Sequence, residues 1–320
     1  MPLLNPTDST SSVTNVKPSL QWVVGILLLG ILCWFFAIVP RYGNLSAFGW
    51  VSTAWNSETD YEHGPLFPLV IIGLVVHQFK AIRQSLGEPN AWGLLVVLLG
   101  AFFYVIGFRT LQPRITLGSL PFLVWGCVLC WWGFQTARKL IFPVFFFWLA
   151  IPLPSFQQAT VHLQLLATKL ADLGAGIFGV ETVVQGTAIS SANGEWAPLE
   201  IAKGCSGIRS LMALIMIAAV WAYVSKMSLW KRLLLFFSAL PVAIIGNALR
   251  VTSIFVISEY GDAKWAAGTW HDWSGLLLFY PISLMLLLFL HTLLEGGLPW
   301  RKSQKRRLTS RTVKQEDMNS

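Results

Sequence analysis

Long apolar runs recur along this chain and constrain its fold more than any other feature. A helix needs about 17 or more apolar residues to cross a bilayer. Six runs meet this length and two shorter ones come close to it, at 20–39, 92–108, 115–134, 205–224, 233–257 and 276–294, and at 65–79 and 140–153. Because a helix satisfies its own backbone hydrogen bonds in lipid, the pattern predicts an all-α polytopic membrane protein with about eight transmembrane helices.

The composition supports this prediction and excludes several other classes of protein. The 320 residues are 55% hydrophobic and only 12% charged, whereas soluble domains carry about 25% charged residues. Disorder over the whole chain and a nucleic-acid-binding module are therefore excluded. Four cysteines are too few and too scattered for a disulfide framework.

The positive charges predict the orientation and the division of the chain. With eight spans and a cytoplasmic N-terminus, 15 of the 23 Lys and Arg residues fall in cytoplasmic segments. The expected parts are a disordered cytoplasmic N-terminus (1–19), N-terminal transmembrane helices (20–153), an extracytoplasmic segment (154–204), transmembrane helices with the candidate catalytic residues (205–297) and a basic cytoplasmic tail (298–320).

The extracytoplasmic segment has two recognisable parts. Five apolar residues follow a helical spacing, which predicts an amphipathic helix at the membrane interface: Leu163, Leu166, Leu170, Leu173 and Ile177. After this helix, β-branched residues flank Gly186, and Asn193 and Gly194 precede another apolar stretch at 199–202. These patterns predict short strands and turns that form a small β element.

Three polar residues in consecutive predicted helices converge on the extracytoplasmic face. Cys205 stands in the first turn of a helix, where free backbone N–H groups and the helix dipole favour the nucleophilic thiolate. Arg250 lies inside a span, where an arginine costs about 3 kcal/mol or more. His271 precedes the last span and can transfer protons near neutral pH. A nucleophile, a fixed cation and a proton shuttle indicate acyl transfer.

Each of these residues also has a simpler interpretation, and several neighbours can support them. A buried cysteine can be a small apolar residue, an arginine can extend its side chain to the membrane surface, and a histidine can belong to the interfacial belt. The candidate supporting residues are Gly207, Arg209, Asn247 and Asp272, which lie near the three in sequence, and His63 from an earlier extracytoplasmic segment.

Two other motifs give little support for a redox site or a metal site. Cys127 and Cys130 form a C-x-x-C motif in the middle of a span, away from aqueous redox partners. His63 with Asp60 and Glu62 matches no metalloprotease spacing. We therefore expect neither thiol oxidoreductase chemistry nor a metal or organic cofactor.

Five motifs together resemble the exosortase/archaeosortase family over roughly residues 20–295. They are, in chain order, DYEHG at 60–64, IPLP at 151–154, GCSGIRS at 204–210, NALR at 247–250 and HDWSG at 271–275. The resemblance implies a membrane cysteine transpeptidase or protease, and the family's proposed Cys, Arg and His correspond to Cys205, Arg250 and His271. Gly204 and Glu62 depart from the family's usual Ala and Ser, and neither departure removes a proposed catalytic group.

The resemblance also implies partners and a location. The expected substrates are exported precursors with a C-terminal sorting signal: a short motif, a transmembrane helix and a basic tail, as in PEP-CTERM proteins. The expected location is the bacterial inner membrane, with the active site on the extracytoplasmic side, in contact with lipid. A separate extracytoplasmic partner protein is possible, and nucleic acid is not expected.

Three alternatives stay open from the sequence. The acyl group can pass to water, as in a protease, or to an amine, as in a transpeptidase. A transporter or export-assembly scaffold would use Arg250 and Arg209 to line a substrate path. A membrane acyltransferase would attach a lipid chain to Cys205 instead of a peptide.

Overall fold

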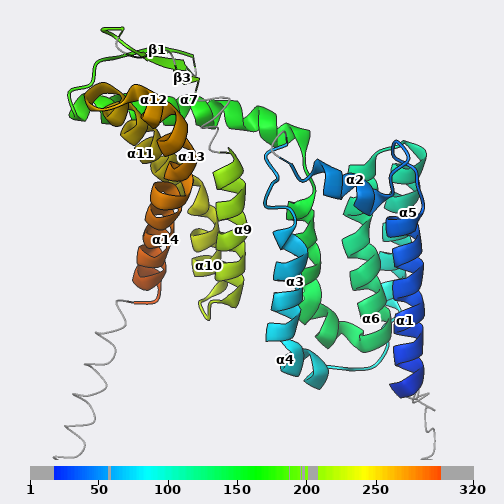
Figure 1. Ribbon diagram of the computed structural model, residues 1–320. Coiled ribbons are helices and arrows are strands. Elements are labelled where there is room, and N and C mark those ends of the chain that lie inside the picture. Colours follow the sequence, from blue (N-terminus) through cyan, green and yellow to red (C-terminus); the bar gives the residue numbers. More distant parts are fainter. Residues whose placement is uncertain are drawn as a thin grey trace, which may run out of the picture. The chain divides into compact units, whose positions relative to one another are not determined.

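The computed structural model describes residues 18–56, 59–186, 188–194, 196, 199–200 and 208–296 (Figure 1). The chain divides into two compact units. Met1–Ala54 and Pro65–Ile151 form the first unit, and Trp55–Gly64 and Pro152–Ser320 form the second. Of the N-terminus predicted to be disordered (1–19), residues 18 and 19 begin a helix, and the rest of it, like the basic tail, lies outside the described residues.

The first unit is helical. Its elements are α1 (Pro18–Cys33), η1 (Trp34–Ile38), α2 (Ala47–Ala54), α3 (Leu66–His77), α4 (Phe79–Gln84), α5 (Trp92–Arg109), α6 (Pro113–Phe145) and η2 (Phe146–Ala150). The α5 helix matches the span predicted at 92–108 and packs along α6. Glycines permit this close approach: a Cβ on Gly107 would lie 2.5 Å from the backbone nitrogen of Thr116.

Gly133 divides α6 into two helical legs. Its φ of 77° and ψ of 177° are not helical, and a residue with a side chain rarely adopts such a positive φ. The indole N–H of Trp125 on one leg donates to the carbonyl oxygen of Ala137 on the other, at 2.7 Å. The runs predicted at 115–134 and 140–153 thus form the two legs of α6 with its η2 extension.

The second unit combines helices with a small sheet. Its elements are α7 (Pro154–Ile177), β1 (Thr182–Gln185), β2 (Ala188–Ser191), β3 (Leu199–Glu200), α9 (Ile208–Val224), α10 (Leu229–Phe237), α11 (Ala239–Tyr260), α12 (Ala263–Trp265), η3 (Ala266–Trp270), α13 (His271–Ser274), η4 (Gly275–Phe279) and α14 (Tyr280–Leu294). Both parts of the predicted extracytoplasmic segment are therefore present as a helix and a sheet.

Small residues of α7 pack this helix against α11. Ala167, Ala171 and Ala175 are buried at a spacing of four residues, so they share one face of α7. The Thr252 hydroxyl of α11 donates to the backbone carbonyl of Ala171 at 3.3 Å. Ile177, on the face predicted to be apolar, is 84% exposed, as expected of a face turned to lipid.

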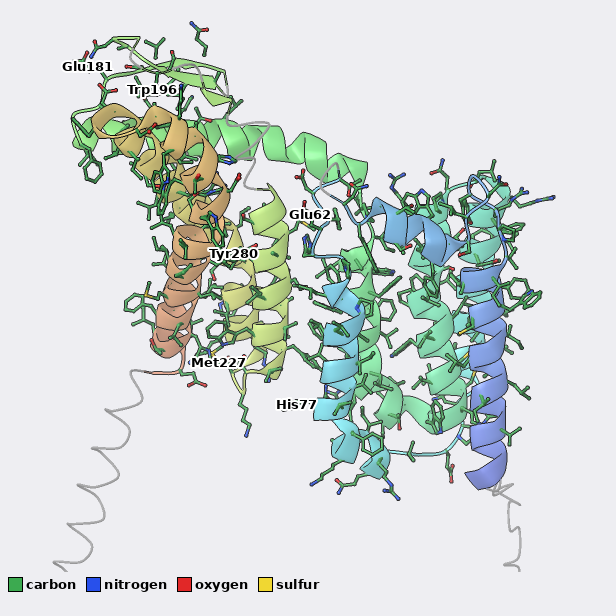
Figure 2. The ribbon with its side chains drawn as sticks, in the orientation of Figure 1. Glu62, His77, Glu181, Trp196, Met227 and Tyr280 are labelled. Atoms are coloured by element: carbon green, nitrogen blue, oxygen red, sulfur yellow. The ribbon has the colours of Figure 1, made fainter. Side chains whose placement is uncertain are left out.

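The sheet is anchored to the Tyr260 end of α11. Its strands are antiparallel in the order β1-β2-β3. The ring of Trp196 stacks on Phe255 of α11 with centroids 5.5 Å apart, and its indole N–H donates to the Glu259 carboxylate at 2.8 Å. Trp196 is labelled in Figure 2. The strands therefore rest on the helix that carries Arg250.

Four helical runs among the described residues are long and apolar enough to cross a membrane: Trp92–Arg109, Pro113–Ala150, Leu229–Tyr260 and Ala263–Leu294. Three shorter apolar helices accompany them, at Gly25–Ile38, Leu66–His77 and Ser210–Val224. The protein is a mostly helical membrane protein, while the number of about eight spans stays a prediction.

Candidate functional site

Arg250 and Asn247 lie on one buried face of α11. They are three residues apart, so their side chains are neighbours on the helix surface. Arg250 is 8% exposed and Asn247 is 4% exposed. An arginine at this depth requires bound partners because an unsolvated charge is costly.

The partners of Arg250 come from the next helical run, which differs from the sequence prediction. Asp262 caps the start of this run by accepting from the backbone N–H groups of Lys264 and Trp265, at 2.8 and 3.1 Å. The run then continues to Leu294. His271 therefore lies inside a helical run, in a single α-helical turn between two π-helical stretches, η3 and η4. The sequence analysis had placed it just before the last span.

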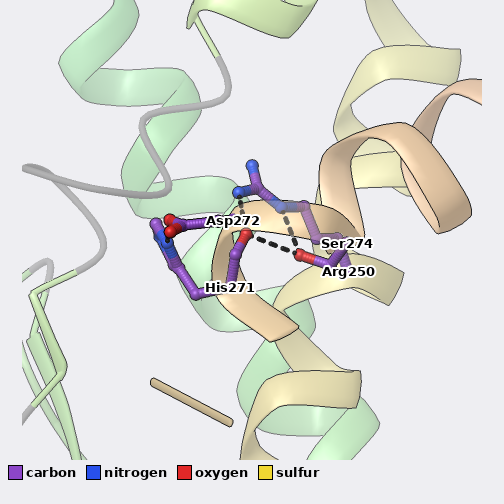
Figure 3. A network of polar contacts seen from close by, with 4 residues as sticks. All are labelled: Arg250, His271, Asp272 and Ser274. Atoms are coloured by element: carbon purple, nitrogen blue, oxygen red, sulfur yellow. Dashed lines mark hydrogen bonds and ion pairs between the residues drawn. The ribbon is translucent and has the colours of Figure 1, made fainter. Parts of the chain in front are cut away.

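Arg250 holds this turn through two hydrogen bonds (Figure 3). Its Nε donates to the Ser274 hydroxyl at 2.9 Å, and its Nη2 donates to the backbone carbonyl of His271 at 2.9 Å. The Ser274 hydroxyl in turn donates to the same carbonyl at 3.0 Å. The guanidinium thus contacts the main chain of the predicted proton shuttle.

The His271 imidazole lies beside Asp272. Its Nδ1 is 3.1 Å from Oδ1 of Asp272, and the two side chains are 23% and 79% exposed. When the Asp272 carboxylate accepts a hydrogen bond from Nδ1–H of the neutral ring, the lone pair of the imidazole lies on the second ring nitrogen, Nε2. Because Asp272 is largely solvated, this contact orients the ring more than it stabilises the fold.

The segment Trp55–Gly64 belongs to the same unit as Arg250 and His271. The rings of Tyr61 and His63 stack with centroids 5.5 Å apart. Both residues are buried, and Tyr61 packs against Met212 of α9. Residues of the DYEHG motif thus lie against the helix that directly follows the predicted nucleophile in sequence.

Gly64 is expected to tolerate no side chain. A Cβ at this position would lie 2.1 Å from Cγ of Trp55, an atom close to the backbone that cannot move aside easily. We expect Gly64→Ala to lower the free energy of unfolding by about 1–3 kcal/mol. Thermal unfolding of the purified protein in detergent measures this loss. Gly73→Ala is the control, because among the described residues no atom outside its chain neighbours and its own helix backbone lies within 4 Å of its Cβ position. Equal stability of the two variants would contradict the packing described here.

His63 is expected to make stability depend on pH. Burial lowers the pKa of His63 below its ordinary value of 6.5. The unfolded chain therefore binds more protons below that pH, and the free energy of unfolding falls as the pH falls through about 6.5. We expect His63→Gln to reduce the loss of thermal stability between pH 7.5 and 5.5. His77→Gln, at an exposed position, should leave that loss unchanged. An unaltered pH dependence in His63→Gln would show the prediction to be wrong.

Comparison with known proteins assigns the family. The family model for transmembrane exosortases matches residues 55–289. The chain belongs to the transmembrane exosortase family. No curated protein and no solved structure gives a significant match. The matched region includes all of the segment 55–64, α7, α9 and α11, and the Arg250 network.

The exosortase match confirms the resemblance seen in the sequence, and the structure places only part of the predicted site. Arg250, His271 and Asp272 come together, Asn247 is one turn away on α11, and His63 lies on the Trp55–Gly64 segment of the same unit. Cys205 and Gly207 lie outside the described residues. The Arg209 backbone belongs to α9, while its side chain lies outside the described set.

Sequence reasoning missed Ser274, Ser253 and Trp270 in this exosortase-family chain. Ser274 is fully buried and bonds to Arg250, and Ser253 accepts from the Trp270 indole N–H at 2.9 Å. The available signal was the helical spacing of Ser274 from His271, which places the serine hydroxyl within reach of the His271 carbonyl. Within the described ranges, no three His, Cys, Asp or Glu residues are grouped so that they could hold a metal ion.

Proposed function

We propose that this exosortase-family protein is a membrane-embedded cysteine transpeptidase or protease. It cleaves the C-terminal membrane-anchored sorting signal of exported precursors at the extracytoplasmic face of the bacterial inner membrane. The observation that carries this proposal is the network in which buried Arg250 holds the His271 turn. Family membership supports the choice of reaction.

The proposed reaction has two steps, formation of a thioester and its resolution. The Cys205 thiolate attacks the carbonyl carbon of the scissile peptide bond, and Arg250 stabilises the developing oxyanion. The C–N bond breaks as the leaving amine takes a proton from the His271 imidazolium, which leaves a thioester on Cys205. Water or an acceptor amine then attacks the thioester, transfers its proton to His271 and releases the Cys205 thiolate.

Supporting residues have narrower proposed roles. Asp272 selects the His271 tautomer, in keeping with its 3.1 Å contact to Nδ1. Asn247 orients Arg250 from the preceding turn of α11. Arg209 is the second candidate for stabilising the oxyanion, and Gly207 leaves room for a substrate backbone. His63 stacks on Tyr61 and so supports the residue that packs against α9.

The proposed partners follow from the same chemistry. The substrate is a precursor whose transmembrane helix lies beside the enzyme in the lipid, so its scissile bond is held close to the membrane surface. No cofactor enters either step. A separate extracytoplasmic protein is a further proposed partner.

A processing assay tests the proposed function. A tagged reporter with a PEP-CTERM-like tail is co-expressed with the wild-type chain or with His271→Ala, and immunoblots follow its length. We expect the wild-type chain to shorten the reporter and His271→Ala to slow shortening by about 100-fold or more, the usual contribution of general acid–base catalysis. A transporter or scaffold predicts no shortening by either chain. Failure of wild-type chains on both this reporter and a native precursor would contradict the proposal.

A further inference from the structure

The Ser274 hydroxyl occupies the centre of the Arg250 network. Ser274 is fully buried. Its oxygen accepts from Nε of Arg250 at 2.9 Å and donates to the His271 carbonyl at 3.0 Å. The same carbonyl accepts from Nη2 of Arg250 at 2.9 Å. These three bonds form a closed ring that joins α11 to the His271 turn, as Figure 3 shows.

A second connection ties the other side of His271 to Arg250. The Trp270 indole N–H donates to the Ser253 hydroxyl at 2.9 Å. That hydroxyl donates to the backbone carbonyl of Arg250 at 2.6 Å. The residue before His271 and the residue three positions after it are therefore both bound to groups of α11 that include or contact Arg250.

The backbone around His271 makes such connections useful. The α-helical turn His271–Ser274 lies between two π-helical stretches, Ala266–Trp270 and Gly275–Phe279. Changes between π- and α-helical hydrogen bonding alter the direction of side chains and are frequent at functional sites. A single α-helical turn between such changes gains a fixed orientation from side-chain bonds to a neighbouring long helix.

We propose that Ser274 is a positioning residue for His271. Its hydrogen bonds link Arg250 to the turn that carries the imidazole. The Ser253–Trp270 hydrogen bond links the other side of that turn to α11. The importance of this positioning for processing rests on the proposed function, while the positioning itself does not. Ser274 contacts no reacting atom in the proposed mechanism. Arg250 orients the His271 turn partly through its hydrogen bond to Ser274.

Two measurements on the full chain test this proposal. The first is the rate of reporter processing. The second is the rate at which diethyl pyrocarbonate modifies His271, measured by peptide mass spectrometry, with the other four histidines as internal references. The second measurement does not need an active enzyme, so failure of the proposed function and failure of the positioning role are distinguishable.

The variants are Ser274→Ala, Ser274→Thr and a matched control. Ser283 is also fully buried, and its hydroxyl has no hydrogen-bond partner among the described residues. Ser283→Ala therefore removes a buried hydroxyl without breaking such a bond. We expect Ser274→Ala to slow processing about tenfold or more, the equivalent of one buried hydrogen bond to a charged group. It should also change the His271 modification rate severalfold, whereas Ser274→Thr and Ser283→Ala stay near wild type.

Each outcome decides the proposal. A change in the His271 modification rate in Ser274→Ala, restored by Ser274→Thr, supports the positioning role even if the reporter is never cleaved. Wild-type His271 reactivity in Ser274→Ala overturns it, whether processing is lost or retained. If Ser274→Ala does not accumulate, Ser253→Ala takes its place: loss of the second connection should also change His271 reactivity, and wild-type reactivity there overturns the proposal.

Discussion

Replacing Arg250 by lysine is expected to slow reporter processing about as much as replacing it by alanine, by about a hundredfold. Lysine keeps the positive charge, but it has one nitrogen where arginine has a planar fork of donors. Arg250 uses Nε for Ser274 and Nη2 for the His271 carbonyl. One ammonium group cannot reproduce both directions and also face an oxyanion. A buried hydrogen bond to a charged group contributes about 1.5–3 kcal/mol, and about 1.4 kcal/mol changes a rate tenfold.

Arg232→Lys provides the matched control for this experiment. Arg232 also donates through Nε to a backbone carbonyl, that of Met227 at 2.8 Å, but it lies on α10, away from the His271 turn. We expect Arg232→Lys to process the reporter at a rate close to wild type. Immunoblots of membrane fractions establish that each variant accumulates. Near-normal processing by Arg250→Lys would show that only the positive charge matters. It would contradict a role for the two directed hydrogen bonds of Arg250.

The rival function, transport of an anionic substrate, requires only the positive charge of Arg250. A transporter that uses Arg250 to line a path for an anionic substrate needs a positive charge and not a fork of donors. Because a transporter also predicts that the wild-type chain leaves the reporter intact, shortening by the wild-type chain and its loss in both variants together separate the two functions. Equal loss in both variants favours the transpeptidase or protease.

The sequence predicted the parts of the fold that depend on local pattern. The apolar run at 92–108 corresponds to α5, and the β-branched residues around Gly186 correspond to β1 and β2. Gly186 has a φ of 64°, which explains why a glycine lies at that turn. Such features depend on residues close together in the chain, so their pattern is visible without a structure.

The features that the sequence did not predict depend on contacts between distant segments. The division of α6 at Gly133 requires a φ of 77°, and an isolated glycine within an apolar run does not reveal which conformation it adopts. The alanine face that packs α7 on α11 carries a weaker hydrophobic signal than the neighbouring leucines. Small residues pack well because they allow two backbones to approach closely, which depends on the partner helix.

The candidate site was likewise predicted only in part, because some of its contacts join segments that are distant in sequence. Periodicity and topology brought Arg250 and His271 to one region, because an intramembrane arginine and a titratable histidine are conspicuous. Ser274 was not conspicuous, since serine is common and its role depends on hydrogen bonds that cross between two helices. The π-helical stretches on either side of His271 have no recognised sequence signature, and they place this residue within a helical run instead of just before it.

Cys205→Ala is expected to abolish processing, because no other group in the proposed mechanism forms the acyl intermediate. Loss of a covalent nucleophile removes a whole reaction path, so the effect should exceed that of any positioning residue. Cys205→Ser should also be strongly impaired, since a hydroxyl is ionised far less than a thiol at neutral pH. The matched control is Cys33→Ala, which removes an exposed cysteine of α1 and should process normally.

The most direct test of thiol catalysis is therefore one immunoblot of the tagged reporter. It compares wild-type chain, Cys205→Ala and Cys33→Ala at equal membrane levels. The account predicts a shortened reporter with wild type and Cys33→Ala, and only full-length reporter with Cys205→Ala. Shortening of the reporter by Cys205→Ala at the wild-type rate would contradict it.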